Sequence, residues 1–331
     1  MKAIHMKTLI EGVWTDRDIE KPTPDGSFAR KESIFRNWIT VDGKPGITGK
    51  GGFKAESGRY HLYVSLACPW AHRVMIFRQL KGLNDHITAS IVHPLMLEKG
   101  WELRSDYQGT TGDPVLGKSN IYEVYLAADQ SVTSRASVPV LWDRETKTIV
   151  SNESSEIIRM FNWAFNKITG NAMDYYPQKL RADIDLVNTD IYNDINNGVY
   201  KTGFSKTQAA YSKSYSALFR RLDKLEKRLS LSRYLIGDRI TEADWRLFTT
   251  LIRFDAVYFG HFKCNYKRIV DYPSLWAYTR ELFQLPGISS TVDLDHIKTH
   301  YYGSHLMLNP YGIIPSGPEI DFYEPFDRTN L

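Results

Sequence analysis

The sequence predicts a mixed α/β domain followed by an all-helical domain. Short strand-like and helical segments alternate between residues 58 and 166, whereas apolar residues recur at spacings of three and four over residues 175–302. With 331 residues, the chain is long enough for each domain to bury a core. We expect an N-terminal extension over residues 1–57, a linker within residues 166–177 and an irregular tail over residues 303–331, because Gly, Pro and polar residues are frequent there.

Composition and charge argue against several classes of protein. A hydrophobic content of 42% and a charged content of 24% are typical of globular proteins, and a net charge of +4 without a basic run predicts no nucleic-acid partner. No apolar signal core or membrane-length stretch occurs, so we expect a cytoplasmic protein without a membrane partner. The chain has two cysteines, Cys68 and Cys264, which predicts neither a disulfide framework nor a metal site.

The stretch YHLYVSLACPWAHRVMIFRQL, residues 60–80, predicts a buried strand, a tight turn and a helix. Pro69 suits the first position of a helix, and apolar residues at helical spacing follow it. This places Cys68 over the free N–H groups of the helix, where the nucleophilic thiolate is favoured. An unreactive buried cysteine is the alternative interpretation. The order strand, Cys, Pro, helix favours the reactive one.

The CPWA motif has no second cysteine three residues after Cys68. Cys68 therefore cannot close the local disulfide of a dithiol oxidoreductase, and an external thiol must resolve any bond that it forms. Glutathione is the abundant cytosolic thiol. We expect it to be the co-substrate.

Two further stretches belong to the predicted α/β domain. SVPVLWD predicts a strand opened by Pro139, followed by a turn and a second strand ending near Val150. A proline in a buried strand is unusual, so we interpret Pro139 as cis, with an ordinary edge-strand proline as the alternative. SNESSEIIRMF then begins a helix, and Glu153 and Ser154 lie at its N-terminus, where carboxylates bind. Read alone, these residues also fit a simple capping box.

The second half of the chain is helical by pattern. Apolar residues recur at helical spacing in the segments 178–198, 206–230, 242–259 and 273–285. Thr241 precedes Asp244 by three residues, a signature of a helix N-terminus. Cys264 follows no strand-to-helix turn, and we interpret it as non-catalytic.

Several motifs together resemble one family over nearly the whole chain. FRNWIT, VSLACPWAHR, SVPVLWD, NESSEI and HIKTHYYGSHLMLNP are similar to motifs of the glutathionyl-hydroquinone reductases, also called Xi-class glutathione transferases. The resemblance implies the glutathione transferase architecture: a thioredoxin-like domain, then a helical bundle, here with extensions at both ends. It also implies a homodimer, with no permanently bound cofactor, that uses glutathione as co-substrate and glutathionylated quinols as substrates.

The resemblance further implies the roles of single residues. Cys68 is expected to attack the thioether sulfur, and a second glutathione to release glutathione disulfide. The residues expected to contact glutathione are Trp101, Arg135, Ala136, Ser137, Val138, Glu153 and Ser154.

Three tyrosines are expected to surround the sulfur. Tyr200 is assigned as the proton donor to the departing aromatic carbon, and Tyr258 and Tyr301 as hydrogen-bond donors to the thiolate. Tyr302 is the alternative to Tyr301. With twenty tyrosines in the chain, these assignments depend on position in the family.

Two other functions compete with the reductase. An omega-like thiol transferase would use Cys68 on mixed disulfides or dehydroascorbate without cleaving the C–S bond of glutathionyl hydroquinones. A binding module of the same fold would have an unreactive Cys68.

Overall fold

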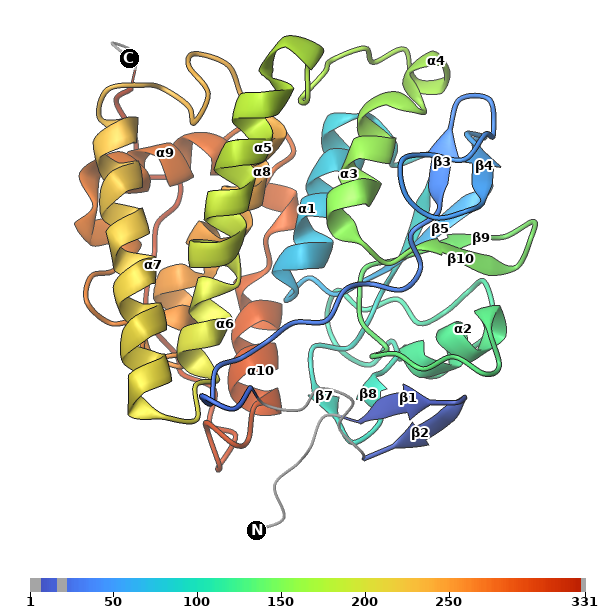
Figure 1. The fold of residues 1–331 in the computed structure, drawn as a ribbon, viewed down its shortest axis with the longest axis horizontal. Helices are drawn as coiled ribbons and strands as arrows, with labels where there is room; N and C mark the ends of the chain where they lie inside the picture. The colour runs from blue at the N-terminus through green and yellow to red at the C-terminus, as the bar shows by residue number, and fades with distance from the viewer. Residues whose placement is uncertain (1–6, 17–22, 329–331) are drawn as a thin grey trace. The chain divides into compact units, whose positions relative to one another are not determined.

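The computed structural model describes residues 7–16 and 23–328, which form two compact units (Figure 1). The α/β unit contains the described residues of 7–16, 31–173 and 295–313. The helical unit contains residues 23–30, 174–294 and 314–328. The predicted domain ranges follow sequence order, whereas contacts place residues 23–30 of the extension with the helical unit and residues 295–302 with the α/β unit.

The α/β unit is built on a four-stranded sheet in the order β10-β9-β5-β6. Its strands are β5 (Tyr60–Val64), β6 (Thr88–Ile91), β9 (Val140–Asp143) and β10 (Thr148–Ser151). β5 pairs with β6 in parallel and with β9 antiparallel, and β9 and β10 form a hairpin. Every residue of β5 is buried, as expected for a central strand covered on both faces.

Three helices pack around this sheet (Figure 1). α1 (Pro69–Leu80) and α3 (Ser154–Trp163) lie side by side, and α2 (Ile121–Ala128) lies beside β10. These elements follow the predicted order along the chain. They confirm the thioredoxin-like prediction.

The N-terminal extension contains strands that the sequence did not predict. They are β1 (Thr8–Ile10), β2 (Val13–Thr15), β3 (Trp38–Thr40) and β4 (Gly52–Lys54), and the later loop adds β7 (Met96–Leu97) and β8 (Gly100–Trp101). β1 and β2 form a hairpin that pairs through Leu9 with Ser134, and β3 lies beside α3. Strands of two or three residues are too short to show an alternating pattern in the sequence.

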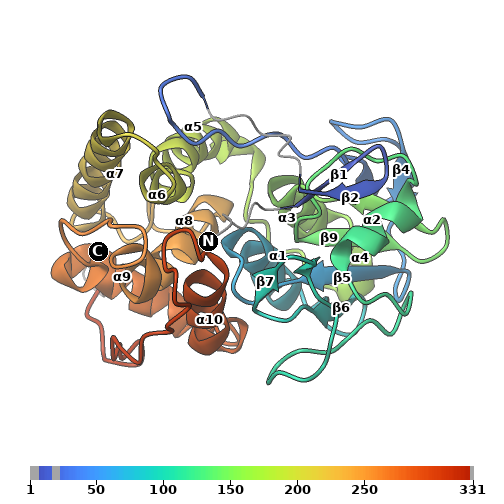
Figure 2. The ribbon, with the colours of Figure 1, turned by 90° about the horizontal axis from the view of Figure 1, so that it is seen from below.

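The helical unit follows the predicted segments, with breaks that periodicity did not reveal. Its main helices are α5 (Arg181–Ile191), α6 (Gly198–Gly203), α7 (Gln208–Leu229), α8 (Glu242–Arg253) and α9 (Pro273–Phe283). α6 packs against α7 (Figure 2), and α5 packs against α8. π-helical turns follow α5 and α8, η2 (Tyr192–Asn196) and η3 (Phe254–Tyr258). The predicted start of α8 is confirmed, because Thr241 and Asp244 form a capping box.

Shorter helices complete the two units: α4 (Asn166–Thr169), η1 (Gln178–Leu180), η4 (Ile269–Asp271) and η5 (Ser289–Thr291). Across residues 7–16 and 23–328, no helix has both the length and the apolar character needed to cross a bilayer.

One helix outside the predicted segments, α10 (Leu294–Ser304), packs into the α/β unit from near the end of the chain. The amide of Met96 donates to the Ser304 hydroxyl over 2.9 Å, and the His300 ring Nδ1 donates to the Pro94 carbonyl over 2.9 Å. The loop around β7 therefore depends on residues that follow it by about two hundred positions in the sequence.

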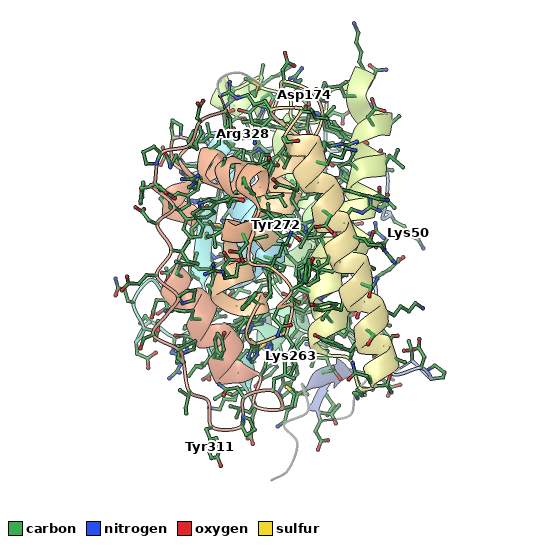
Figure 3. All side chains as sticks on the ribbon, turned by 90° about the vertical axis from the view of Figure 1, so that its left-hand side faces the viewer. Lys50, Asp174, Lys263, Tyr272, Tyr311 and Arg328 are labelled. Atoms are coloured by element: carbon green, nitrogen blue, oxygen red, sulfur yellow. The ribbon has the colours of Figure 1, made fainter. Side chains whose placement is uncertain are left out.

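The tail after α10 is irregular, as predicted, but one of its side chains is firmly held. Arg328 is 3% exposed in the helical unit (Figure 3) and forms an ion pair of 3.0 Å with Glu281 of α9. Its guanidinium also donates to the backbone carbonyls of Leu229, Ser232, Arg233 and Ser274. A buried guanidinium with this many acceptors fixes the tail against α9.

Candidate active site

Cys68 lies at the N-terminus of α1, in the strand–turn–helix geometry that the sequence predicted. Its backbone is extended, with φ of −77° and ψ of 121°, and Pro69 occupies the first helical turn. Its carbonyl accepts the amide of His72 over 2.9 Å, which begins the helix. The first N–H groups of a helix have no intrahelical acceptor, so a thiolate here is stabilised by them and by the helix dipole.

The thiol of Cys68 reaches the strand that carries the predicted cis proline. Cys68 Sγ lies 3.5 Å from the carbonyl oxygen of Val138, and the Val138–Pro139 peptide bond is cis, as predicted. Cys68 is 9% exposed and Val138 is 4% exposed. The backbone of Val138 and the sulfur of Cys68 therefore lie within one small site.

The segment before Val138 is fixed from two sides. Tyr125 of α2 donates its hydroxyl to the Ser137 carbonyl over 3.0 Å, and the Asn152 side chain donates to that hydroxyl over 2.9 Å. The amide of Ser137 donates to the carbonyl of Arg135 over 3.0 Å, which makes a tight turn around Ala136. This network joins the residues before the cis bond to the start of α3.

Glu153 caps α3 with its own carboxylate, and Ser154 is the first residue of the helix. One oxygen of Glu153 accepts the Ser155 amide over 3.0 Å and the Ser155 hydroxyl over 2.7 Å. The other accepts the hydroxyl of Ser33 over 3.0 Å. Burial alone would raise the pKa of Glu153, but these hydrogen bonds and the charge of Arg73 outweigh it and lower the pKa. Glu153 is therefore an anion held in one orientation.

Ser33 belongs to a stretch of the extension that lies along the start of α3. Phe35 and Asn152 exchange two hydrogen bonds, of 3.0 and 3.2 Å, and Arg36 forms an ion pair with Glu156. The sequence did not assign these contacts, because they join residues about 120 positions apart. The FRNWIT motif marked the stretch only through the family resemblance.

Trp101 and Tyr301 lie in one aromatic cluster of the α/β unit. Trp101 of β8 stacks on His300 of α10 with ring centroids 4.6 Å apart, and His300 contacts Tyr301 edge to face at 5.1 Å. Tyr301 is 1% exposed, whereas the adjacent Tyr302 is half-buried. His300 was not among the predicted residues, since only α10 brings it to Trp101.

Tyr200 and Tyr258 lie together in the helical unit, on α6 and η3. Their ring centroids are 6.2 Å apart. Phe262 contacts both rings, each at 5.5 Å. The other two residues predicted to act at the sulfur, Cys68 and Tyr301, belong to the α/β unit, so the four predicted catalytic residues are divided between the two units.

The second cysteine, which we interpret as non-catalytic, lies in the core. Cys264 is fully buried, and burial raises the pKa of its thiol. A thiol that stays protonated is a poor nucleophile.

Comparisons with known proteins identify the relatives of this chain. Residues 67–163 match the family described as glutathione S-transferase, N-terminal domain, and residues 208–281 match the glutathione S-transferase, C-terminal domain. Glutathionyl-hydroquinone reductase YqjG of Escherichia coli K12 is 52% identical over 98% of both chains. Glutathionyl-hydroquinone reductase PcpF of Sphingobium chlorophenolicum is 47% identical, covering 95% of this chain and 96% of that protein.

Solved structures agree with these relatives. The glutathione-bound structure of Escherichia coli YqjG matches with a TM-score of 0.90 and 51% identity, covering 97% of this chain and 98% of that chain. A Xi-class glutathione transferase from Natrialba magadii matches with a TM-score of 0.92 and 44% identity, covering 99% and 98%. The predicted combination of a thioredoxin-like domain and a helical bundle is confirmed by these matches.

Proposed function

Since this chain belongs to the glutathionyl-hydroquinone reductases, the Xi class of glutathione transferases, we propose that it reduces S-glutathionyl hydroquinones to hydroquinones with glutathione. The observation that carries the proposal is the position of Cys68 at the start of α1, 3.5 Å from the carbonyl of Val138. A thiol at a helix N-terminus, next to the backbone of the residue before the cis proline, is what attack on a bound glutathionyl sulfur requires.

The glutathionyl group has suitable partners around Cys68 in the α/β unit. In our proposal its cysteinyl backbone pairs with Val138, and its γ-glutamyl carboxylate binds the N–H groups at the start of α3 and the Ser154 hydroxyl. The anionic Glu153 receives the ammonium. The remaining contacts of the proposed glutathione site come from Trp101, Arg135, Ala136 and Ser137.

The proposed reaction proceeds in two exchanges of sulfur. The Cys68 thiolate attacks the thioether sulfur, an S–S bond forms and the C–S bond breaks. The aromatic carbon takes the electron pair and a proton, which releases the hydroquinone. A second glutathione thiolate then attacks the glutathionyl sulfur of the mixed disulfide, releasing glutathione disulfide and the Cys68 thiolate. Two glutathionyl sulfurs are oxidised as the quinol carbon is reduced.

Tyrosines supply the proton and support the thiolate in this proposal. Tyr200 donates the proton to the aromatic carbon and recovers one from the second glutathione, and Tyr258 and Tyr301 donate hydrogen bonds to sulfur. The aromatic character of the cluster around Tyr200 also suits a flat quinol ring.

The test is product analysis with a glutathionyl hydroquinone and excess glutathione, comparing the wild type with Cys68→Ser. Free hydroquinone and glutathione disulfide from the wild type alone are expected. Release of hydroquinone by Cys68→Ser near the wild-type rate would refute the nucleophile. If the wild type reduces a small mixed disulfide but releases no hydroquinone, it is an omega-like thiol transferase. If it shows no activity in either assay, it is a binding module.

We also propose a cytoplasmic homodimer. A thiolate nucleophile that depends on glutathione requires a reducing compartment. Light scattering coupled to gel filtration measures the mass in solution, and a mass near the 38.2 kDa of one chain would refute the dimer.

A further inference from the structure

Part of the N-terminal extension is built as a folded turn of the helical unit. The carboxylate of Asp25 accepts the Thr23 hydroxyl over 2.6 Å, the Ser27 amide over 3.0 Å and the Ser27 hydroxyl over 2.9 Å. These hydrogen bonds lower the pKa of Asp25 to about 2. The turn therefore keeps its acceptor charged even at mildly acidic pH. We call residues 23–30 the docked arm.

The docked arm is attached to the chain between α6 and α7 (Figures 1 and 2). The Lys206 amide donates to the carbonyl of Gly26 over 3.1 Å, and the Thr207 hydroxyl donates to the carbonyl of Asp25 over 3.0 Å. Gly26 has a φ of +78°, and a Cβ there would lie 2.9 Å from the Thr207 methyl group. The PDGS turn thus matches this surface closely, with a glycine where both conformation and space require one.

The docked arm places two side chains on Tyr200. The Phe28 ring lies 6.4 Å from the Tyr200 ring, and the guanidinium carbon of Arg30 lies 5.1 Å from the centroid of that ring. Arg30 Nε donates to the side-chain oxygen of Asn197 over 2.9 Å. Asn197 is buried at the start of α6. Arg30 is therefore oriented by a fixed acceptor on the helix that carries Tyr200.

We propose that Arg30 is a positioning residue for Tyr200, which holds the phenol in place and stabilises its phenolate form. This inference rests on the proposed function, in which Tyr200 gives its proton to the quinol carbon. A guanidinium over a phenol ring is attracted to the ring face. A nearby positive charge also favours the anion that remains after proton transfer. Tyr200 then becomes a stronger acid and a faster donor.

The test is a double-mutant cycle of Arg30→Gln and Tyr200→Phe, measured as C–S cleavage of a glutathionyl hydroquinone. Arg30→Gln is expected to lower kcat about fivefold in the presence of Tyr200. In the Tyr200→Phe background, the same substitution is expected to change kcat by less than about twofold. Disulfide exchange with a small glutathione mixed disulfide does not require a proton to be donated to a carbon atom. Arg30→Gln should therefore carry out this exchange at the wild-type rate.

The pH profile separates an electrostatic role from a structural one. Activity falls as the pH rises and the proton donor ionises. Without the cation, Arg30→Gln should move this alkaline limb to higher pH. Arg30→Lys keeps the charge and should retain the wild-type limb. If the alkaline limb of Arg30→Lys moves to higher pH, the electrostatic role of Arg30 is overturned. Arg30→Lys also provides a test if Arg30→Gln fails to fold.

Arg181 offers a matched control, because its guanidinium carbon lies 5.1 Å from the Tyr176 ring in the same unit. Arg181→Gln should leave kcat and the pH profile unchanged. If Arg30→Gln lowers kcat equally with Tyr200 and with Tyr200→Phe, the role of Arg30 is overturned, whereas the assignment of Tyr200 as proton donor is unaffected. If Tyr200→Phe alone leaves C–S cleavage at the wild-type rate, the assignment of Tyr200 falls first, and that of Arg30 falls with it.

Discussion

Ser33→Ala tests whether the N-terminal extension takes part in glutathione binding. Ser33 donates its hydroxyl to one oxygen of Glu153 over 3.0 Å, and Ser155 donates to the other oxygen. The substitution leaves the Ser155 contacts and removes the hydrogen bond that Glu153 receives from Ser33 of the extension. Glu153 then still caps α3 through the oxygen that accepts from Ser155. Its other carboxylate oxygen loses the hydrogen bond from Ser33, so the carboxylate group is held less firmly. The ammonium of glutathione would meet a less ordered carboxylate.

The size of the effect follows from these contacts. A hydrogen bond to a charged group contributes about 1.5–3 kcal/mol, and the lower end applies because Ser33 and Glu153 are half-buried. Only part of this is lost on binding, since Glu153 retains its two bonds from Ser155. At about 1.4 kcal/mol per factor of ten, we expect the Kd for glutathione to rise about three- to tenfold. Neither residue touches the sulfur in the proposed reaction, so kcat should change little.

Titration calorimetry with glutathione measures this Kd, in a Cys68→Ser background that cannot form the mixed disulfide. Ser33→Thr keeps the hydroxyl and should restore binding. Ser131→Ala is the matched control, because the Ser131 hydroxyl donates over 2.8 Å to Asp129 in a surface loop of the same unit. An unchanged Kd for Ser33→Ala, or an equal loss for Ser131→Ala, would refute the role of Ser33.

Three further predictions concern single side chains. His300→Ala removes the ring that stacks on Trp101 and should raise the KM for glutathione about fivefold with little change in kcat, whereas an unchanged KM contradicts the role of the stack. Burial lowers the pKa of His61 to about 4, so the folded state binds fewer protons than the unfolded state below pH 6.5 and loses stability as the pH falls. Urea denaturation of His61→Gln should therefore show about 2 kcal/mol less destabilisation between pH 7 and 5 than the wild type, and identical pH dependence would contradict this. Arg328→Ala removes one of the two ion pairs of the buried Glu281, which keeps its pair with Arg233, and takes the guanidinium donor from four backbone carbonyls. It should lower the free energy of unfolding by about 3 kcal/mol, a loss that denaturation by guanidinium measures and a value near zero refutes.

Local signals predicted the centre of the α/β unit well. The strand before Cys68, the proline after it and the apolar spacing of the helix all lie within about twenty residues, and the structure confirms each of them. The cis bond at Pro139 and the cap at Glu153 are likewise local features that the structure bears out. The chemical roles of these residues come from the family and stay proposals.

The contacts that complete these sites are not local. Ser33 lies 120 residues from Glu153, Arg30 lies 167 residues from Asn197, and His300 lies 206 residues from Pro94. No periodicity links such pairs, and a serine or arginine in a Gly- and Pro-rich stretch looks like an ordinary loop residue. Tertiary contacts alone bring these residues to the proposed sites.

The placement of α10 has a consequence for how this protein is made. The α/β unit begins near the N-terminus, yet it takes in residues 295–313, and Ser304 and His300 of α10 hold the loop that carries Trp101. During synthesis, nearly the whole helical unit emerges from the ribosome before these residues do. The sheet and Cys68 can form early, but the thioredoxin-like unit closes only after residues 174–294 of the helical unit have been synthesised. A truncated nascent chain therefore carries the nucleophile without the completed aromatic cluster.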